Sequence, residues 1–270
     1  MRWTRTWSSL LFLALATSLV VPTHAWAADE PAWKQIADDD GIIVWKKSVP
    51  GTSFVAFRGR GLVDADIYDV FAVLYDVDHK KELMANCVDY RLLEYRTPGN
   101  VIVYNRIGSP FFLISDRDSV IETKVVFEPE HKRIVTSFFK GDDQLMESPS
   151  GVVRTKALQG SWTLQATEDG KTDLTYQVMA DPGGLLPGWL VNLASRKLPH
   201  RTIQNMRSQV KRTQVYKRSR LWVKYLFDFK GLLPNPHPAL ARTVEEEAEF
   251  MAEFNALKSK QKAQRASSEP

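Results

Sequence analysis

The sequence has one cysteine, Cys87, in 270 residues. A single cysteine excludes an internal disulfide, so the apolar core alone must stabilise the fold, and a chain of this length is long enough to form one. We expect Cys87 to be a small buried side chain and not a nucleophile. Apolar runs are short as well, since none reaches the roughly 20 residues that a membrane-spanning helix requires.

Sequence patterns of metal sites and nucleophilic enzymes are missing. The five histidines are scattered, without the spacing of metal ligands. Neither a G-x-S-x-G turn nor a glycine-rich phosphate loop occurs. We therefore predict a protein that is not an enzyme, with no metal and no cofactor.

Acidic residues are missing from residues 183–227, which contain neither Asp nor Glu. The basic residues of this segment are Arg196, Lys197, Arg201, Arg207, Lys211, Arg212, Lys217, Arg218, Arg220 and Lys224. A surface of this charge suits anionic lipid headgroups or nucleic acid as a partner.

The first 27 residues have the parts of a secretory signal peptide. Arg2 and Arg5 precede an apolar run over residues 10–21, and Pro22 ends that run. Residues 25–27, Ala-Trp-Ala, place small side chains where a signal peptidase reads them. A membrane anchor is the alternative, but the run is shorter than the roughly 20 residues that spanning requires. We expect export to the periplasm or secretion, which disfavours nucleic acid as a partner.

Strand patterns dominate the middle of the chain. They are bounded by turn residues such as Pro98-Gly99-Asn100 and rich in branched and aromatic side chains. The predicted strands are residues 42–48, 53–63, 88–94, 101–107, 119–127, 133–139, 152–164 and 172–179. The predicted short helices are residues 33–37, 64–75 with Asp64 as the cap, and 78–84.

A long helix is predicted after the last strand, because Asp181-Pro182-Gly183-Gly184 breaks the strand pattern and Pro187 suits a first helical turn. One apolar face would hold Leu190, Leu193 and Ala194, then Ile203, Met206 and Val210, with a kink at Pro199. Strands closed by one long helix predict an α+β domain. Beyond Tyr216 we expect a proline-rich linker at 232–238, an amphipathic helix at 244–257 and disorder at 258–270.

Three blocks of sequence carry a resemblance to a known family. The first is Tyr75-Asp76-Val77-Asp78-His79-Lys80-Lys81, and the second is Ser115-Asp116-Arg117-Asp118. The third combines Gly151-Val152-Val153-Arg154, Tyr176, Asp181-Pro182-Gly183-Gly184 and Leu186-Pro187-Gly188-Trp189-Leu190-Val191-Asn192. In this order and spacing, residues 33–211 resemble the START (StAR-related lipid transfer) domain, especially its phosphatidylcholine-transfer-like members.

The resemblance implies a helix-grip fold, shared by START and Bet v 1-like proteins. In this fold a curved antiparallel sheet wraps around a long C-terminal helix and encloses an apolar cavity. Residues 28–217 would form this domain, and residues 218–270 a C-terminal extension. The implied function is to bind one phospholipid, sterol or fatty acid and to transfer or present it between membranes, as a monomer that touches a membrane surface transiently. The alternative is a helix-grip cyclase or hydrolase of lipid-like substrates.

The lipid-binding candidates are Lys80, Tyr104, Arg106, Arg117, Asp118, Tyr176, Leu190 and Ala194. Lys80 aligns with a phosphate-binding residue of the phosphatidylcholine-transfer members, whereas Met84 replaces its acidic companion, so the resemblance does not specify the lipid. Arg117 and Asp118 would hold a ligand group or form a structural ion pair. Tyr104 and Arg106 share one strand face, which would bind the ligand if it points inward and be solvated if it points outward.

The membrane-docking candidates are Leu185, Leu186, Trp189, Arg196 and Lys197. An exposed Trp beside a basic helix suits insertion at a membrane interface. The alternatives are a core position for Trp189 and an ordinary solvated face for the basic residues.

Overall fold

One ten-stranded antiparallel sheet forms the frame of the structure, which is a computed structural model describing residues 32–109, 113–184, 186–227, 231–233 and 243–268. The strand order is β1-β2-β3-β10-β9-β7-β6-β5-β4, and the short β8 pairs with β6 in parallel. The predicted signal peptide lies outside the described residues.

The elements follow in the order of the chain. The strands are β1 (Lys34–Asp39), β2 (Ile42–Ser48), β3 (Val55–Val63), β4 (Cys87–Thr97), β5 (Asn100–Ile107), β6 (Arg117–Glu128), β7 (Arg133–Lys140), β8 (Val153–Arg154), β9 (Ala157–Ala166) and β10 (Thr172–Asp181). The helices are α1 (Ile67–Tyr75), α2 (Lys80–Leu83), α3 (Gly188–Ser195), α4 (Leu198–Gln209), α5 (Lys217–Leu226) and α6 (Val244–Ser268), with short 3-10 turns at Pro129–His131 and Asp143–Leu145.

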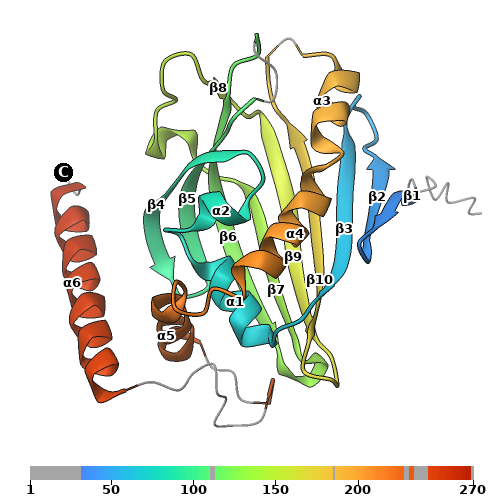
Figure 1. Cartoon of the computed structure of the whole chain (residues 1–270). Coiled ribbons are helices and arrows are strands. Elements are labelled where there is room, and N and C mark those ends of the chain that lie inside the picture. The colour runs from blue at the N-terminus through green and yellow to red at the C-terminus, as the bar shows by residue number, and fades with distance from the viewer. Residues whose placement is uncertain (1–31, 110–112, 185, 228–230, 234–242, 269–270) are drawn as a thin grey trace, which may run out of the picture. The chain divides into compact units, whose positions relative to one another are not determined.

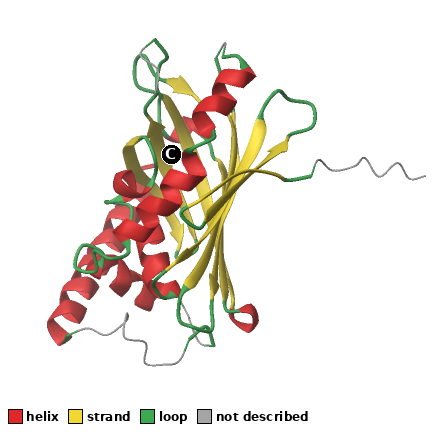
Figure 2. Ribbon diagram, turned by 45° about the vertical axis from the view of Figure 1, so that its right-hand side comes forward, coloured by secondary structure: helices red, strands yellow, loops and turns green. Residues whose placement is uncertain are grey.

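The sheet curves, and α1, α2 and α4 lie on its concave face (Figures 1 and 2). Helix α4 approaches β3 closely because β3 has glycine where the two elements cross. A Cβ atom at Gly59 would lie 2.7 Å from Cβ of Pro199, and one at Gly61 would lie 3.2 Å from Ile203 Cγ2. These glycines let the helix sit against the sheet. This is a helix-grip α+β fold, as predicted.

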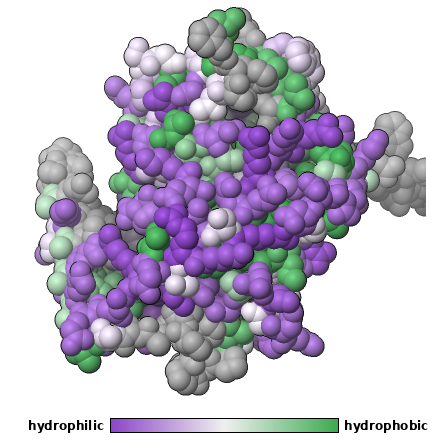
Figure 3. Space-filling view, viewed as in Figure 1, coloured by the Kyte–Doolittle hydropathy of each residue, from purple (hydrophilic) through white to green (hydrophobic). Residues whose placement is uncertain are grey.

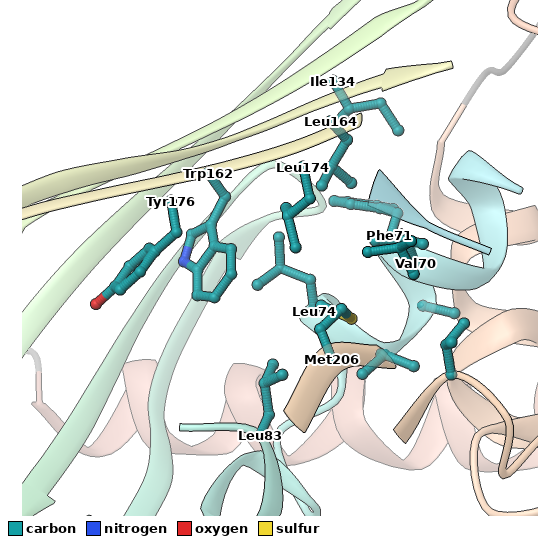
Figure 4. Packing of buried hydrophobic residues seen from close by; sticks show 14 of the residues in the cluster. Val70, Phe71, Leu74, Leu83, Ile134, Trp162, Leu164, Leu174, Tyr176 and Met206 are labelled. Carbon is teal, nitrogen blue, oxygen red and sulfur yellow. The ribbon is translucent and has the colours of Figure 1, made fainter. Parts of the chain in front are cut away.

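A packed core joins the sheet to α1 and α4 at one end of their interface (Figure 4). Ile134, Leu164 and Leu174 lie opposite one another on β7, β9 and β10 and are fully buried. They belong to one apolar cluster with Phe71 of α1 and Met206 of α4. Each such side chain contributes about 1.5–3 kcal/mol through its burial.

Three local predictions are wrong. Residues 33–37 do not form a helix, because Lys34–Asp39 pairs with β2 as the edge strand β1. Asp66 caps α1 instead of Asp64: its Oδ1 accepts from the backbone N–H groups of Tyr68 and Asp69, both at 2.9 Å. The predicted strand 152–164 is divided into β8, which turns onto β6, and β9.

The predicted long helix is two helices, since α3 ends at Ser195 and α4 begins at Leu198. Pro199 lies in the first turn of α4, where its missing N–H costs no helical hydrogen bond. The C-terminal helix α6 extends to Ser268, through part of the segment expected to be disordered. Helix α5 lies almost entirely in the predicted C-terminal extension, which we expected to be partly helical without assigning a helix before residue 244.

Candidate functional site

A cavity of about 510 Å³ lies between the sheet and the helices. Its wall is mostly apolar and includes Leu74, Val103, Ile121, Phe138 and Trp162. A mostly apolar cavity of this size, with a few polar groups in its wall, is typical of sites that bind small apolar or amphipathic ligands. The interior of the described domain is therefore packed at one end and hollow at the other.

Alternate residues of β5 and β6 line the cavity, as expected for strands with one face inward. The inward residues are Val101, Val103, Asn105 and Ile107 on β5 and Arg117, Ser119, Ile121, Thr123 and Val125 on β6. From Arg117 to Val125 the wall is about 26 Å long, at about 3.3 Å per residue. This length suits an extended ligand.

The cavity is polar toward one end of these strands. Asn105 lies opposite Ser119, and Ile107 lies opposite Arg117. Val101 and Val103 face Thr123 and Ile121 farther along. On these two strands the charged and amide side chains therefore lie at one end, and the helices add a second polar part of the wall with Asp76, Asp78, Lys80, Arg218 and Ser219.

Lys80 lies in the cavity wall and is 5% exposed. Its Nζ donates to the Leu74 carbonyl and lies 5.5 Å from the centre of the Tyr90 ring. No carboxylate of the described residues forms an ion pair with it. Burial lowers the pKa of Lys80 to about 8, and Asp76 partly opposes this shift. Lys80 thus offers a buried positive charge to the cavity at neutral pH.

Arg117 and Asp118 point to opposite faces of β6. Arg117 lines the cavity, and its Nε donates to the Pro182 carbonyl at 3.4 Å. Asp118 is fully buried outside the cavity and accepts from Nε (2.8 Å) and Nη2 (3.1 Å) of Arg154. Because β6 and β8 pair Asp118 with Arg154, two blocks of the family resemblance meet in one structural ion pair.

Tyr104 and Arg106 lie on the outward face of β5 and are not part of the cavity wall. Tyr104 is nevertheless fully buried, and the Arg91 guanidinium lies 5.7 Å from the centre of its ring. Arg106 forms an ion pair with Asp116 at 2.6 Å. The structure therefore separates these two candidates from Lys80 and Arg117.

Tyr176 lines the cavity beside Trp162, with ring centres 4.2 Å apart (Figure 4). The next residue across the sheet is Thr136, which lies opposite Trp162 and is 9% exposed. Its Oγ1 is buried without a hydrogen-bond partner among the described residues. An unsatisfied buried hydroxyl costs about 1–3 kcal/mol, so a hydrogen bond from the Thr136 hydroxyl to a polar atom of a ligand would be favourable.

In α3 the residues that line the cavity are shifted by one position from the predicted helical face. Val191, Ser195, Leu198 and Thr202 line the cavity, whereas the half-buried Leu190 does not and Leu193 is 55% exposed. Ala194 lies in α3, and Leu185 lies outside the described residues. The apolar pattern could not separate these neighbouring positions, because α3 has apolar residues on most of its circumference.

The other membrane-docking candidates are at the surface. Trp189 is 68% exposed, Arg196 and Lys197 are exposed, and Leu186 is half-buried. Leu113, in the loop before β6, is 90% exposed. That loop leads to Arg117, whose Nη2 donates to the Gly183 carbonyl just before α3 (3.5 Å), so both segments emerge at the same end of the sheet.

Sequence reasoning missed four cavity residues near the C-terminus. Arg218, Ser219 and Trp222 come from α5, and Phe254 comes from α6. The spacing of Leu221, Trp222, Tyr225 and Leu226 is a helical signal, but it does not indicate contact with a cavity. Such contact depends on tertiary packing against α1.

Two further properties concern the described residues only. Helices long and apolar enough to cross a membrane do not occur among them. Within the same residues no group of His, Cys, Asp and Glu side chains is placed to hold a metal ion. Cys87 is half-buried, and burial raises the pKa of its thiol to about 11, which fits a thiol that does not react as a nucleophile.

The curved sheet, its helices and the cavity define a START-like lipid-binding domain. Residues 63–207 match the family described as polyketide cyclase / dehydrase and lipid transport. An uncharacterised Pseudomonas aeruginosa protein is 32% identical over 176 residues, which cover 65% of this chain and 85% of the relative. The chain therefore belongs to the polyketide cyclase/dehydrase and lipid transport family.

Two relatives carry functional names. The bovine phosphatidylcholine transfer protein is 24% identical over 192 residues, or 70% of this chain and 87% of the relative. A STAR-related lipid transfer protein fragment from Xanthomonas axonopodis superposes with a TM-score of 0.60 at 28% identity, covering 66% of this chain and 98% of that fragment. Both matches support a lipid transfer domain of the START type.

Proposed function

We propose that the protein binds one lipid in the cavity and transfers or presents it between membranes of an extracytoplasmic compartment, as a monomer. The observation that carries this proposal is the apolar cavity of about 510 Å³ with a polar end. The signal-peptide pattern of the first 27 residues supports export, and the named relatives support lipid transfer.

The polarity of the wall supports one orientation of the lipid. The headgroup lies in the polar part of the wall that the helices supply, near Lys80, Ser219 and Arg218, where cations and a hydroxyl are available. The acyl part lies along Val103, Ile121, Phe138 and Trp162 and gains about 0.8 kcal/mol per buried methylene. Lys80 is 5% exposed and forms no ion pair with a carboxylate of the described residues, so a ligand oxygen is its natural partner.

The end of the molecule that carries α3 is the proposed membrane contact. Trp189, Leu193 and Leu113 expose apolar surface there, with Arg196 and Lys197 next to them. Apolar atoms are visible at this end in Figure 3. Aromatic and basic side chains together suit the interface of an anionic membrane, where each basic residue contributes about 1 kcal/mol.

The family description also includes cyclases and dehydrases, which would need acid and base groups facing a substrate. The carboxylates in the wall are Asp76 and Asp78. Asp76 accepts from His79 and Ser219, and Asp78 accepts from Arg218 at 3.4 Å. These hydrogen bonds favour a structural role for both carboxylates and therefore favour a carrier.

Native mass spectrometry of the purified protein after incubation with mixed phospholipid vesicles tests the proposal. We expect a mass increase of one lipid per chain, and lipid extraction then identifies the ligand. A chain that stays unloaded with every lipid class offered, while remaining folded, would exclude the carrier function.

A further inference from the structure

Helices α5 and α6 form part of the cavity wall although they follow the family-matched residues 63–207. Helix α5 supplies Arg218, Ser219 and Trp222, and α6 supplies Phe254. Because this part of the wall lies outside the family-matched segment, we looked here for a binding property particular to this chain.

Helix α5 is fixed to the core of the domain. Ser219 Oγ donates to Asp76 of the turn after α1, and these residues are only 6% and 7% exposed. Arg220 forms an ion pair with Asp69 of α1 at 2.7 Å. Leu221 and Val223 are buried as well. This part of the cavity wall is therefore firmly held.

Helix α6 is held mainly from one side, by α5, and most of its described side chains are exposed (Figure 1). Phe250 packs edge-on against Trp222, with ring centres 4.8 Å apart, and stacks on Tyr225 at 4.4 Å. Ion pairs between Lys217 and Glu246 and between Arg218 and Glu253 add to this contact. Helix α6 thus covers α5 through one aromatic patch and a small set of charges.

Arg218 links helix α6 to the cavity. It lines the cavity, yet its side chain is 52% exposed, so the cavity wall reaches solvent at this residue. Its Nη2 donates to Glu253 of α6, and its Nη1 donates to Asp78 Oδ2 at 3.4 Å. The next residue after Glu253 is Phe254, which also lines the cavity. The Glu253 carboxylate of α6 is therefore bound by Arg218 at the point where the cavity wall reaches solvent.

We infer that Arg218 binds the anionic headgroup, phosphate or carboxylate, of the lipid in the cavity, and that Glu253 takes the headgroup's place when the cavity is empty. The inference rests on the proposed function. A guanidinium binds carboxylate and phosphate oxygens in the same two-pronged geometry, so an entering headgroup replaces Glu253 directly. A zwitterionic headgroup brings its own cation and competes less well for Arg218.

The test compares uptake of NBD-acyl phosphatidylglycerol and NBD-acyl phosphatidylcholine from vesicles of otherwise neutral lipid. The variants are Arg218→Gln, Glu253→Gln, the double variant, and Glu249→Gln as the matched control, since Glu249 is an exposed glutamate of the same helix. We expect Arg218→Gln to lower the preference for the anionic probe about tenfold. Glu253→Gln should raise the preference for the anionic probe. The double variant should have the same preference as Arg218→Gln, and Glu249→Gln the same preference as the unaltered protein.

The outcomes separate this inference from the function on which it rests. If the unaltered protein takes up neither probe, both the proposed function and the role of Arg218 are contradicted. Uptake of both probes with the same preference in Arg218→Gln removes only the role of Arg218. An increase in uptake by Glu253→Gln that persists in the double variant, or that is equal for both probes, would mean that α6 only blocks access to the cavity. That result would overturn the competition between Glu253 and the headgroup. Displacement of the anionic probe by an equal concentration of inorganic phosphate makes Arg218 a free-anion site and also overturns the inference.

Discussion

The two ends of the interface between sheet and helices differ although the same strands build both. Ile134, Leu164 and Leu174 meet α1 and α4 in a packed core, whereas Leu158 and Val178, farther along β9 and β10, face the cavity. Phe138, Trp162 and Tyr176 mark the boundary, because they belong to the core cluster and also line the cavity. One strand can therefore stabilise the fold with one half and bind a ligand with the other.

Side-chain size and the two-part helix explain the hollow end. Glycine, alanine and serine occupy positions 160, 180 and 195 there, and Phe138 leans over Gly160, where a Cβ atom would lie 2.3 Å from Phe138 Cζ. Helix α4 supplies Ile203 and Met206 to the packed end. Helix α3 supplies Val191 and Ser195 to the hollow end. Space remains because these positions carry small side chains and because the closing helix is divided into α3 and α4.

Truncating a side chain should cost more stability in the packed end than in the cavity wall, as a comparison of Leu174→Ala with Ile121→Ala would show. Leu174 is fully buried and Ile121 is 5% exposed. We expect Leu174→Ala to lower the free energy of unfolding by about 2–5 kcal/mol, because it creates a new cavity. Ile121→Ala costs less than half of that, because it only enlarges existing space. Urea unfolding of lipid-free protein measures both, and equal losses would show that the two ends are equally packed.

The buried charge of Lys80 gives the hollow end a distinct pH dependence. The pKa of Lys80 is about 8 in the folded protein and 10.5 when unperturbed, so the unfolded chain binds more protons between these values. The contribution of Lys80 to stability therefore rises with pH from about 8 to 10.5, by on the order of 2 kcal/mol. The difference in unfolding free energy between the unaltered protein and Lys80→Met should change by this amount across that range. A difference that stays constant from pH 7 to pH 10.5 would contradict the depressed pKa.

Filling the hollow end should affect binding more than folding. Ile121→Trp places a large side chain in the cavity, and we expect lipid uptake to fall at least about tenfold with a change in unfolding free energy below about 1 kcal/mol. Leu164→Trp, the matched change in the packed end, should cost about 1–3 kcal/mol through overpacking. Uptake by Ile121→Trp at the unaltered level would mean that the ligand does not occupy this part of the cavity.

The fold was predictable from the sequence because strand periods, turn residues and the blocks around Asp76, Asp118 and Gly183 act locally or in a fixed order. The site was predictable only in part. Lys80, Arg117 and Tyr176 reach the cavity wall, but strand alternation alone does not tell which face is inward, and Tyr104 and Arg106 lie on the other one. Residues of α5 and α6 were missed because their contribution depends on contacts more than 100 residues away in sequence, such as Ser219 with Asp76.

The smallest expected effect concerns the outer surface of the hollow end. Trp189 is 68% exposed at the proposed membrane contact, whereas Val126, on β6, is 53% exposed near the other end of that strand. We expect Trp189→Ser to weaken co-sedimentation with anionic vesicles roughly three- to tenfold, because the indole no longer enters the interface. Val126→Ser should leave co-sedimentation unchanged, because that end does not meet the membrane. Unchanged co-sedimentation of both variants would place the membrane contact elsewhere. An equal loss in both variants would mean that the binding is nonspecific apolar adhesion.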